Sequence, residues 1–190
     1  MKNTEFENLK FRYKISVIGD ARVGKNTLMR KFTKGTFDKQ YVKTIGVEFS
    51  IHDKIIRGDE IRLIFWNIAS QDEFHFLRPS FFKESFAAII VISLEENELG
   101  KQSFEHIEKW SENIRKYCGD VPLFLFANKV DLIDNNNLND INLQVVTIKY
   151  NFTNYYKTSI RNGRNVIQAF DEIAELLYNK SIELLKRINN

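Results

Sequence analysis

The chain contains 190 residues, 43% of them hydrophobic and 28% charged, which is typical of a globular domain and excludes a disordered chain. Its 28 basic and 25 acidic residues leave a net charge of +3. This balance does not favour nucleic acid as a partner, because nucleic-acid-binding proteins usually concentrate basic charge on one face. The single cysteine, Cys118, cannot form an internal disulfide, so the composition is compatible with a reducing, cytoplasmic compartment.

Apolar runs alternate along the chain with segments of helical periodicity. The runs at 87–93 and 121–127 are apolar at nearly every position, as expected of strands covered on both faces in a parallel sheet. In the segment 166–188, apolar residues recur at steps of three and four, which predicts an amphipathic helix. The alternation predicts a three-layer α/β fold with a mostly parallel six-stranded sheet flanked by helices. The predicted strands are 13–18, 47–51, 61–66, 87–93, 121–127 and 152–156, and the predicted helices are 25–32, 103–116 and 166–188.

The first predicted strand runs directly into the segment GDARVGKNT, residues 19–27, which leads into the first predicted helix. A strand, a loop with this glycine spacing and a helix are the parts of a P-loop, in which backbone N–H groups and a helix N-terminus surround phosphate oxygens. The alternative is a chance glycine-containing turn, which the flanking strand and helix disfavour. Lys25 is expected to reach the β- and γ-phosphates, and Thr27 to offer its backbone N–H to the α-phosphate. Arg22 is explained more simply as a solvated loop charge than as a catalytic group. The candidate phosphate-binding residues are Ala21, Arg22, Val23, Gly24, Lys25, Asn26 and Thr27.

A second polar segment, NKVD at residues 128–131, follows the fifth predicted strand. The Asp131 carboxylate can accept hydrogen bonds from both the N1–H and the 2-amino group of guanine, whereas adenine has no such pair of donors. The simplest explanation of the tetrapeptide alone is a polar turn. Its place downstream of a P-loop instead favours guanine recognition.

Five segments occur here in the order in which one known family carries them. They are GDARVGKN (19–26), FDKQYVKTIGVEF (37–49), WNIASQDEF (66–74), NKVD (128–131) and KTSIRNGRNV (157–166). In these segments the chain resembles the small GTPases of the Ras superfamily, and both TIGVEF and the tryptophan before the third motif are similar to the Rab branch. The resemblance implies a P-loop NTPase G domain over residues 10–188, preceded by an N-terminal extension of residues 1–9 and without a second domain.

The resemblance also implies a role for each matching residue. Lys25 matches the lysine that binds the phosphates, and Tyr41 the residue that covers them. Thr44 matches the switch I threonine that ligates Mg²⁺ and senses the γ-phosphate. Gln71 matches the catalytic glutamine that orients the attacking water. The remaining matches concern the guanine base: Phe37 packs against its ring, Asn128, Lys129 and Asp131 recognise it, and Ser159, Ile160 and Arg161 form the loop that closes over it.

Three residues depart from the family around its Mg²⁺ ion. Asn26 replaces a hydroxyl ligand, and Asn67 replaces a carboxylate that holds the metal, usually through its water shell. Ser70 replaces the glycine whose backbone N–H meets the γ-phosphate. Because Mg²⁺ prefers hard, often anionic oxygen ligands, a metal site of Asn26, Thr44 and Asn67 is expected to bind it weakly. In the family, Asn at the position of Asn26 favours the GDP-bound or empty state. Together the three departures are more typical of a divergent natural protein than of a single introduced change.

The first interpretation is therefore a Rab-like molecular switch that binds GTP, GDP and Mg²⁺, and hydrolyses GTP slowly. It would contact effectors and regulators through residues 37–50 and 67–82. The alternative is a pseudo-GTPase scaffold that binds GDP or GTP, or no nucleotide, without significant hydrolysis. An ATP-dependent P-loop enzyme is a third interpretation, which the NKVD segment disfavours.

The two ends of the sequence bear on location. The N-terminal residues are polar and have no apolar signal segment, and the final residues, LLKRINN, have no cysteine for prenylation. Rab-like proteins usually attach to membranes through such cysteines, so three alternatives are open: the tail was removed, the protein stays soluble, or a partner recruits it to membranes. We expect a cytoplasmic monomer in which no direct lipid anchor is visible.

Overall fold

One seven-stranded sheet forms the centre of the computed structural model, which describes residues 9–33, 41–42, 46–68, 78–133 and 140–189. The strand order is β2-β3-β4-β1-β5-β6-β7. Strands β4, β1, β5, β6 and β7 are parallel, whereas β3 pairs antiparallel with both β4 and β2. The predicted six-stranded, mostly parallel sheet is confirmed, and β2 adds a two-residue strand at its edge. The strands are β1 Lys10–Ile18, β2 Tyr41–Val42, β3 Val47–Ile56, β4 Asp59–Ile68, β5 Ala87–Ser93, β6 Leu123–Asn128 and β7 Asn154–Thr158.

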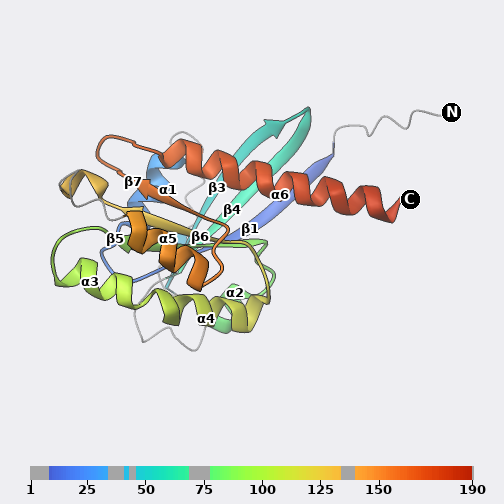
Figure 1. The fold of residues 1–190 in the computed structure, drawn as a ribbon. Coiled ribbons are helices and arrows are strands. Elements are labelled where there is room, and N and C mark those ends of the chain that lie inside the picture. The colour runs from blue at the N-terminus through green and yellow to red at the C-terminus, as the bar shows by residue number, and fades with distance from the viewer. Residues whose placement is uncertain (1–8, 34–40, 43–45, 69–77, 134–139, 190) are drawn as a thin grey trace.

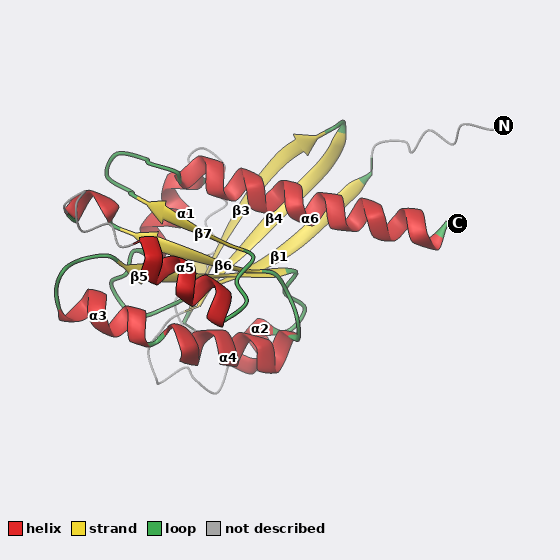
Figure 2. Cartoon of the chain, in the orientation of Figure 1, coloured by secondary structure: helices red, strands yellow, loops and turns green. Residues whose placement is uncertain are grey.

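Helices cover both faces of the sheet, which gives the predicted three layers (Figure 1). Apolar residues of α1 and α6 pack on one face, and those of α2, α4 and α5 pack on the other. Figure 2 shows the long α6 lying across the strands. None of the helices in the described ranges is long and apolar enough to cross a membrane. The helices are α1 Lys25–Phe32, α2 Arg78–Phe82, α3 Glu98–Glu105, α4 Ile107–Cys118, α5 Asp140–Lys149 and α6 Val166–Ile188, with a 3₁₀ turn, η3, at Val130–Leu132.

The core beneath α6 is aromatic. Phe170 of α6 is fully buried, and its ring centroid lies 4.2 Å from that of Phe32, 5.2 Å from Phe65 and 5.2 Å from Phe126. These four rings come from α6, α1, β4 and β6, so the packing joins the C-terminal helix to the elements that border the P-loop.

The predicted strands at 13–18, 121–127 and 152–156 have boundaries that differ from the observed ones by one to three residues, and the short helix α2 was not predicted. Three further differences concern the β3–β4 hairpin, the helix predicted at 103–116, and α5. Strands β3 and β4 are longer than predicted, because they form a hairpin that turns at Arg57 and Gly58 with φ values of 52° and 92°. The helix predicted at 103–116 is interrupted at His106, which separates α3 from α4. Helix α5 was not predicted. Its Ile141, Val145 and Ile148 are 69%, 55% and 81% exposed, so its apolar residues do not mark one buried face.

Candidate nucleotide-binding site

The predicted P-loop joins the end of β1 to the start of α1 and packs tightly against neighbouring strands. Gly19 has a φ of 132°, and a Cβ atom there would lie 2.2 Å from the Val91 carbonyl oxygen on β5. Gly24 has a φ of 103°, and its Cβ would lie 2.4 Å from the side-chain nitrogen of Asn128 on β6. Both positions therefore require glycine. The loop leads into the N-terminus of α1, whose first N–H groups and dipole favour an anionic ligand.

Lys25 lies back across this loop. Its Nζ donates to the carbonyl oxygens of Gly19 and Asp20, each over 2.7 Å, and the residue is only 7% exposed. These contacts hold a positive charge beside the helix N-terminus. The Lys25 ammonium group can therefore pair with the negative charge of a phosphate ligand.

The side chain of Asp20 anchors the P-loop to the helices below the sheet. Asp20 Oδ1 accepts a hydrogen bond of 2.8 Å from Trp110 Nε1, and Asp20 Oδ2 lies 2.7 Å from His106 Nδ1. Neither His106 nor Trp110 was among the predicted site residues. No local pattern could have revealed this contact, because the partners are 86 and 90 residues away in the chain.

Asn128, at the end of β6, connects the P-loop to the two predicted base-binding loops. Its fully buried side chain donates from Nδ2 to the Val23 carbonyl oxygen over 2.8 Å. Its Oδ1 accepts a hydrogen bond of 3.2 Å from Thr158 Oγ1, at the end of β7. One amide therefore links three loops at the carboxyl edge of the parallel strands, where ligands of such sheets bind.

The predicted base-recognition residues are also held by specific contacts. Ser159 Oγ donates to Asp131 Oδ1 over 2.5 Å. Lys129, whose φ is 67°, forms an ion pair with Glu95. The hydrogen bond from Lys129 lowers the pKa of the Glu95 carboxyl. Glu95 was not among the predicted site residues; its place two residues after the end of β5 was the available signal that it borders the site.

Asn26 and Asn67, two of the predicted metal residues, are hydrogen bonded to each other. Asn67 Nδ2 donates to Asn26 Oδ1 over 2.7 Å, and it lies 3.4 Å from Oε2 of Glu48, its cross-strand neighbour on β3. Asn67 Oδ1 is buried and has no hydrogen-bond partner among the described residues. Arg30 Nη2 lies 3.8 Å from Glu48 Oε1.

Asn26 and Asn67, the described members of the predicted metal set, offer no anionic oxygen to a magnesium ion. Mg²⁺ demands hard oxygen ligands in near-octahedral geometry, but the side-chain oxygen of Asn26 already accepts a hydrogen bond from Asn67. The adjacent carboxylate of Glu48 faces the Arg30 guanidinium and the Asn67 amide nitrogen. Within the described ranges, no group of three or more His, Cys, Asp or Glu side chains could hold a metal ion.

Several predicted site residues lie outside the described part of the chain: Phe37, Thr44, Ser70 and Gln71, together with the side chain of Tyr41 in β2. Their roles stay predictions. The other predicted residues belong to the loops after β1, β6 and β7, or to the ends of adjoining elements. They are Ala21, Arg22, Val23, Gly24, Lys25, Asn26, Thr27, Asn67, Asn128, Lys129, Asp131, Ser159, Ile160 and Arg161.

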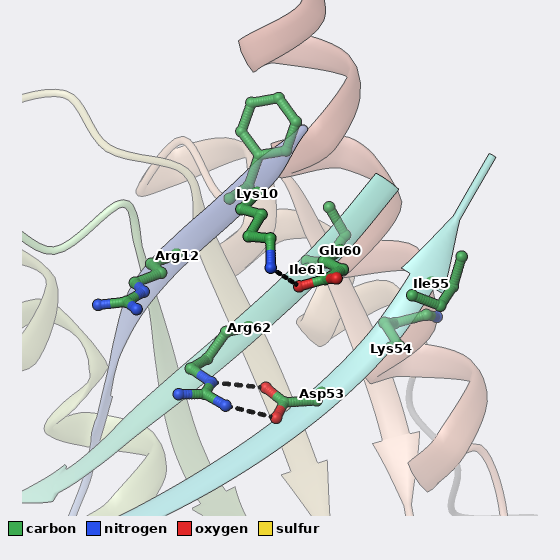
Figure 3. A pocket seen from close by; sticks show the side chains of 9 residues that line it. Lys10, Arg12, Asp53, Lys54, Ile55, Glu60, Ile61 and Arg62 are labelled. Atoms are coloured by element: carbon green, nitrogen blue, oxygen red, sulfur yellow. Dashed lines mark hydrogen bonds and ion pairs between the residues drawn. The ribbon is translucent and has the colours of Figure 1, made fainter. Parts of the chain in front are cut away.

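A separate hollow of about 470 Å³ lies at the other end of β1, on the β1–β4–β3 part of the sheet (Figure 3). Lys10 and Glu60 form an ion pair of 2.9 Å in it. Arg62 makes two hydrogen bonds of 2.7 Å to Asp53, and these bonds lower the pKa of the Asp53 carboxyl. Because these charges are paired with one another, we assign no ligand to this hollow.

A P-loop, a base-recognition loop and the buried amide between them, on a mostly parallel sheet, define a P-loop nucleotide-binding protein. The sequence model of the Ras family matches residues 14–179, and the chain belongs to this family. Rab-19 from Homo sapiens is 29% identical over 180 residues, which cover 94% of this chain and 81% of that protein. Rab-1 from Theileria annulata is 33% identical over 172 residues, covering 90% and 76% respectively. The predicted resemblance to Rab-like small GTPases is confirmed.

Proposed function

We propose that this protein is a guanine-nucleotide-binding molecular switch with slow GTP hydrolysis. Its membership of the Ras family supports the proposal. The observation that carries it is the Asn128 side chain, which ties Val23 of the P-loop to Thr158 beside the base-binding loop. These hydrogen bonds would keep the proposed phosphate-binding and base-binding loops in a fixed relative position. Asp131, fixed by Ser159, would select guanine.

The direct test is to identify, by mass spectrometry, any nucleotide released from the purified protein, and to compete GDP against ATP for binding. A guanosine phosphate and a strong preference for GDP are expected. A protein that retains no nucleotide and does not distinguish GDP from ATP would contradict the proposal.

Replacing Asp131 by Asn is expected to weaken GDP binding by about 30-fold, or about 2 kcal/mol, because one donor of the guanine edge loses its acceptor. The remaining oxygen can still accept the Ser159 hydrogen bond, so the loop should be preserved. Displacement of a fluorescent GDP derivative by GDP and by ADP measures the effect. The control is Asp120→Asn at an exposed turn, which should change neither the affinity for GDP nor the affinity for ADP. Unchanged GDP affinity in Asp131→Asn would contradict the assigned role.

We further propose that the amides of Asn26 and Asn67, with Ser70, weaken the Mg²⁺ site and hence hydrolysis, since the metal neutralises charge that develops during phosphoryl transfer. The hydrogen bond between the two amides also favours a second candidate function, a pseudo-GTPase scaffold that binds nucleotide without hydrolysing it. The two functions differ only in whether any enzyme-dependent hydrolysis occurs.

Single-turnover GTP hydrolysis, with and without Mg²⁺, separates the two candidate functions. In saturating Mg²⁺, the variant Asn26→Ser/Asn67→Asp is expected to hydrolyse GTP at least about tenfold faster than the unmodified protein, because a carboxylate restores a charge worth more than about 1.4 kcal/mol at the metal. A rate in the unmodified protein no higher than that of GTP in buffer would favour the scaffold. No gain in the variant would contradict our account of the metal site.

Protein partners are proposed to bind the face formed by β3, β4 and α2. Phe49 and Trp66 meet edge to face at 4.5 Å, and Phe81 of α2 lies 6.0 Å from Trp66. Lys14 Nζ lies 3.9 Å from the centre of the Trp66 ring. Partly exposed aromatic rings of this kind are enriched in protein interfaces. This face falls within or beside residues 37–50 and 67–82, for which the sequence predicted partner binding.

The remaining expectations stay proposals: a single G domain over residues 10–188 after an extension of residues 1–9, a monomeric state, no nucleic-acid partner, and a cytoplasmic location with recruitment to membranes through partners.

A further inference from the structure

The buried carboxylate of Glu48 determines how the two amides beside the P-loop are oriented. A carboxylate only accepts hydrogen bonds, whereas each Asn side chain has a donor end and an acceptor end. Asn67 therefore turns its nitrogen toward Glu48 Oε2, and the same nitrogen donates to Asn26 Oδ1. If the Asn67 amide were reversed, its oxygen would face two acceptors. Glu48 is 7% exposed and lies opposite Asn67 on the neighbouring strand, so it is well placed to fix the orientation of the Asn67 amide.

The consequence appears at Asn26, the second residue of α1. Because the side-chain oxygen of Asn26 faces Asn67 Nδ2, Asn26 turns its own Nδ2 group away from Asn67, and this group donates no hydrogen bond within the described part of the chain. Asn26 is exposed, whereas Asn67 and its unpartnered oxygen are buried. The group available to a ligand is thus an N–H donor next to Lys25. Such a donor suits a phosphate oxygen and repels a divalent cation.

We propose that Glu48, Asn67 and Asn26 form a hydrogen-bonded relay that takes the place of the divalent cation, so that the protein retains guanine nucleotide without Mg²⁺. In this arrangement Asn26 Nδ2 donates to a phosphate oxygen, and Glu48 is a positioning residue that acts through Asn67. Arg30 Nη2 lies 3.8 Å from Glu48 Oε1, so the relay already has a positive charge beside its carboxylate. The inference rests on the proposed function, because it presupposes that the site binds guanine nucleotide.

The test is the rate at which a bound fluorescent GDP derivative leaves the full chain when excess GDP is added, in Mg²⁺ and in EDTA. For the unmodified protein we expect the same rate in both. Faster release in EDTA would overturn the inference while leaving the proposed function intact. Failure to bind the fluorescent nucleotide in either condition would instead overturn the proposed function, and the inference with it.

Two variants examine the relay itself. Asn26→Ser/Asn67→Asp restores a hydroxyl and a carboxylate, and EDTA should accelerate its nucleotide release by at least about tenfold. Glu48→Gln is isosteric, and its side chain can donate or accept a hydrogen bond. The two Asn amides can therefore invert, which would expose the Asn26 oxygen. We expect EDTA to accelerate nucleotide release from this variant, but by less than in Asn26→Ser/Asn67→Asp. Asn189→Asp, at the C-terminal end of α6, adds the same charge as Asn67→Asp and should behave as the unmodified protein. If both site variants release nucleotide equally in Mg²⁺ and EDTA, the relay is not what replaces the cation.

Discussion

Replacing Lys25 by Met is expected to lower GDP affinity by about 1,000-fold, or about 4 kcal/mol, because a buried charge partner of the phosphates is removed. Met keeps much of the length and apolar volume of the lysine. It cannot donate to the carbonyl oxygens of Gly19 and Asp20, which the Nζ group holds at 2.7 Å. The loop therefore loses both its cation and an internal tether. Titration with a fluorescent GDP derivative measures the loss.

The control for this variant is Lys31→Met, the same substitution six residues further along α1. It should bind GDP as the unmodified protein does, because Lys31 lies near the end of the helix that is remote from the P-loop. Thermal unfolding without nucleotide shows whether Lys25→Met is folded. A folded Lys25→Met protein that binds GDP normally would refute the assignment of the phosphate site to this loop.

Replacing Phe170 by Ala is expected to lower the free energy of unfolding by about 3–5 kcal/mol, the usual cost of deleting a large buried aromatic side chain. Phe170 is fully buried against Phe32, Phe65 and Phe126. The cavity would open between α6 and the sheet, where neighbouring rings cannot all close in. Denaturant unfolding, followed by circular dichroism, measures the change.

This comparison must be made at one fixed nucleotide concentration, since a bound ligand itself raises stability. Ile167→Ala is the matched control, because Ile167 lies on the same helix but is 62% exposed; its effect should stay within about 0.5 kcal/mol. A loss below about 1 kcal/mol in Phe170→Ala would mean that α6 does not pack as described.

Patterns within single segments predicted much of the fold. The strand at Ala87–Ser93 and the helices at Lys25–Phe32 and Val166–Ile188 agree with the sequence prediction residue for residue. In these segments the apolar residues form continuous or periodic runs, and the apolar positions are largely the ones that are buried. Helix α5 was not predicted, because it carries apolar residues such as Ile148 on its exposed side. Its apolar residues therefore do not recur with a helical period.

The candidate site was predicted less completely, because its key contacts join distant segments. Motifs identified Asn26 and Asn67 as candidate site residues. They did not reveal that the Asn67 amide donates a hydrogen bond to the Asn26 amide. Glu48 was named only within a motif, and its pairing with Asn67 depends on the register of β3 against β4. The contact of Trp110 with Asp20 likewise depends on how α4 packs under the loop. Such contacts follow from tertiary packing and leave no local signal.

The side chain of Asn128 also affects how variants of this protein combine. It is fully buried, with its donor on Val23 and its acceptor on Thr158, and it thereby couples the P-loop to the loop after β7, which are proposed to bind the phosphates and the base. Groups that share such a partner show interaction energies, so their individual losses do not sum. Double-mutant cycles between Lys25 and Asp131 therefore report this coupling energy directly, which neither substitution reveals by itself.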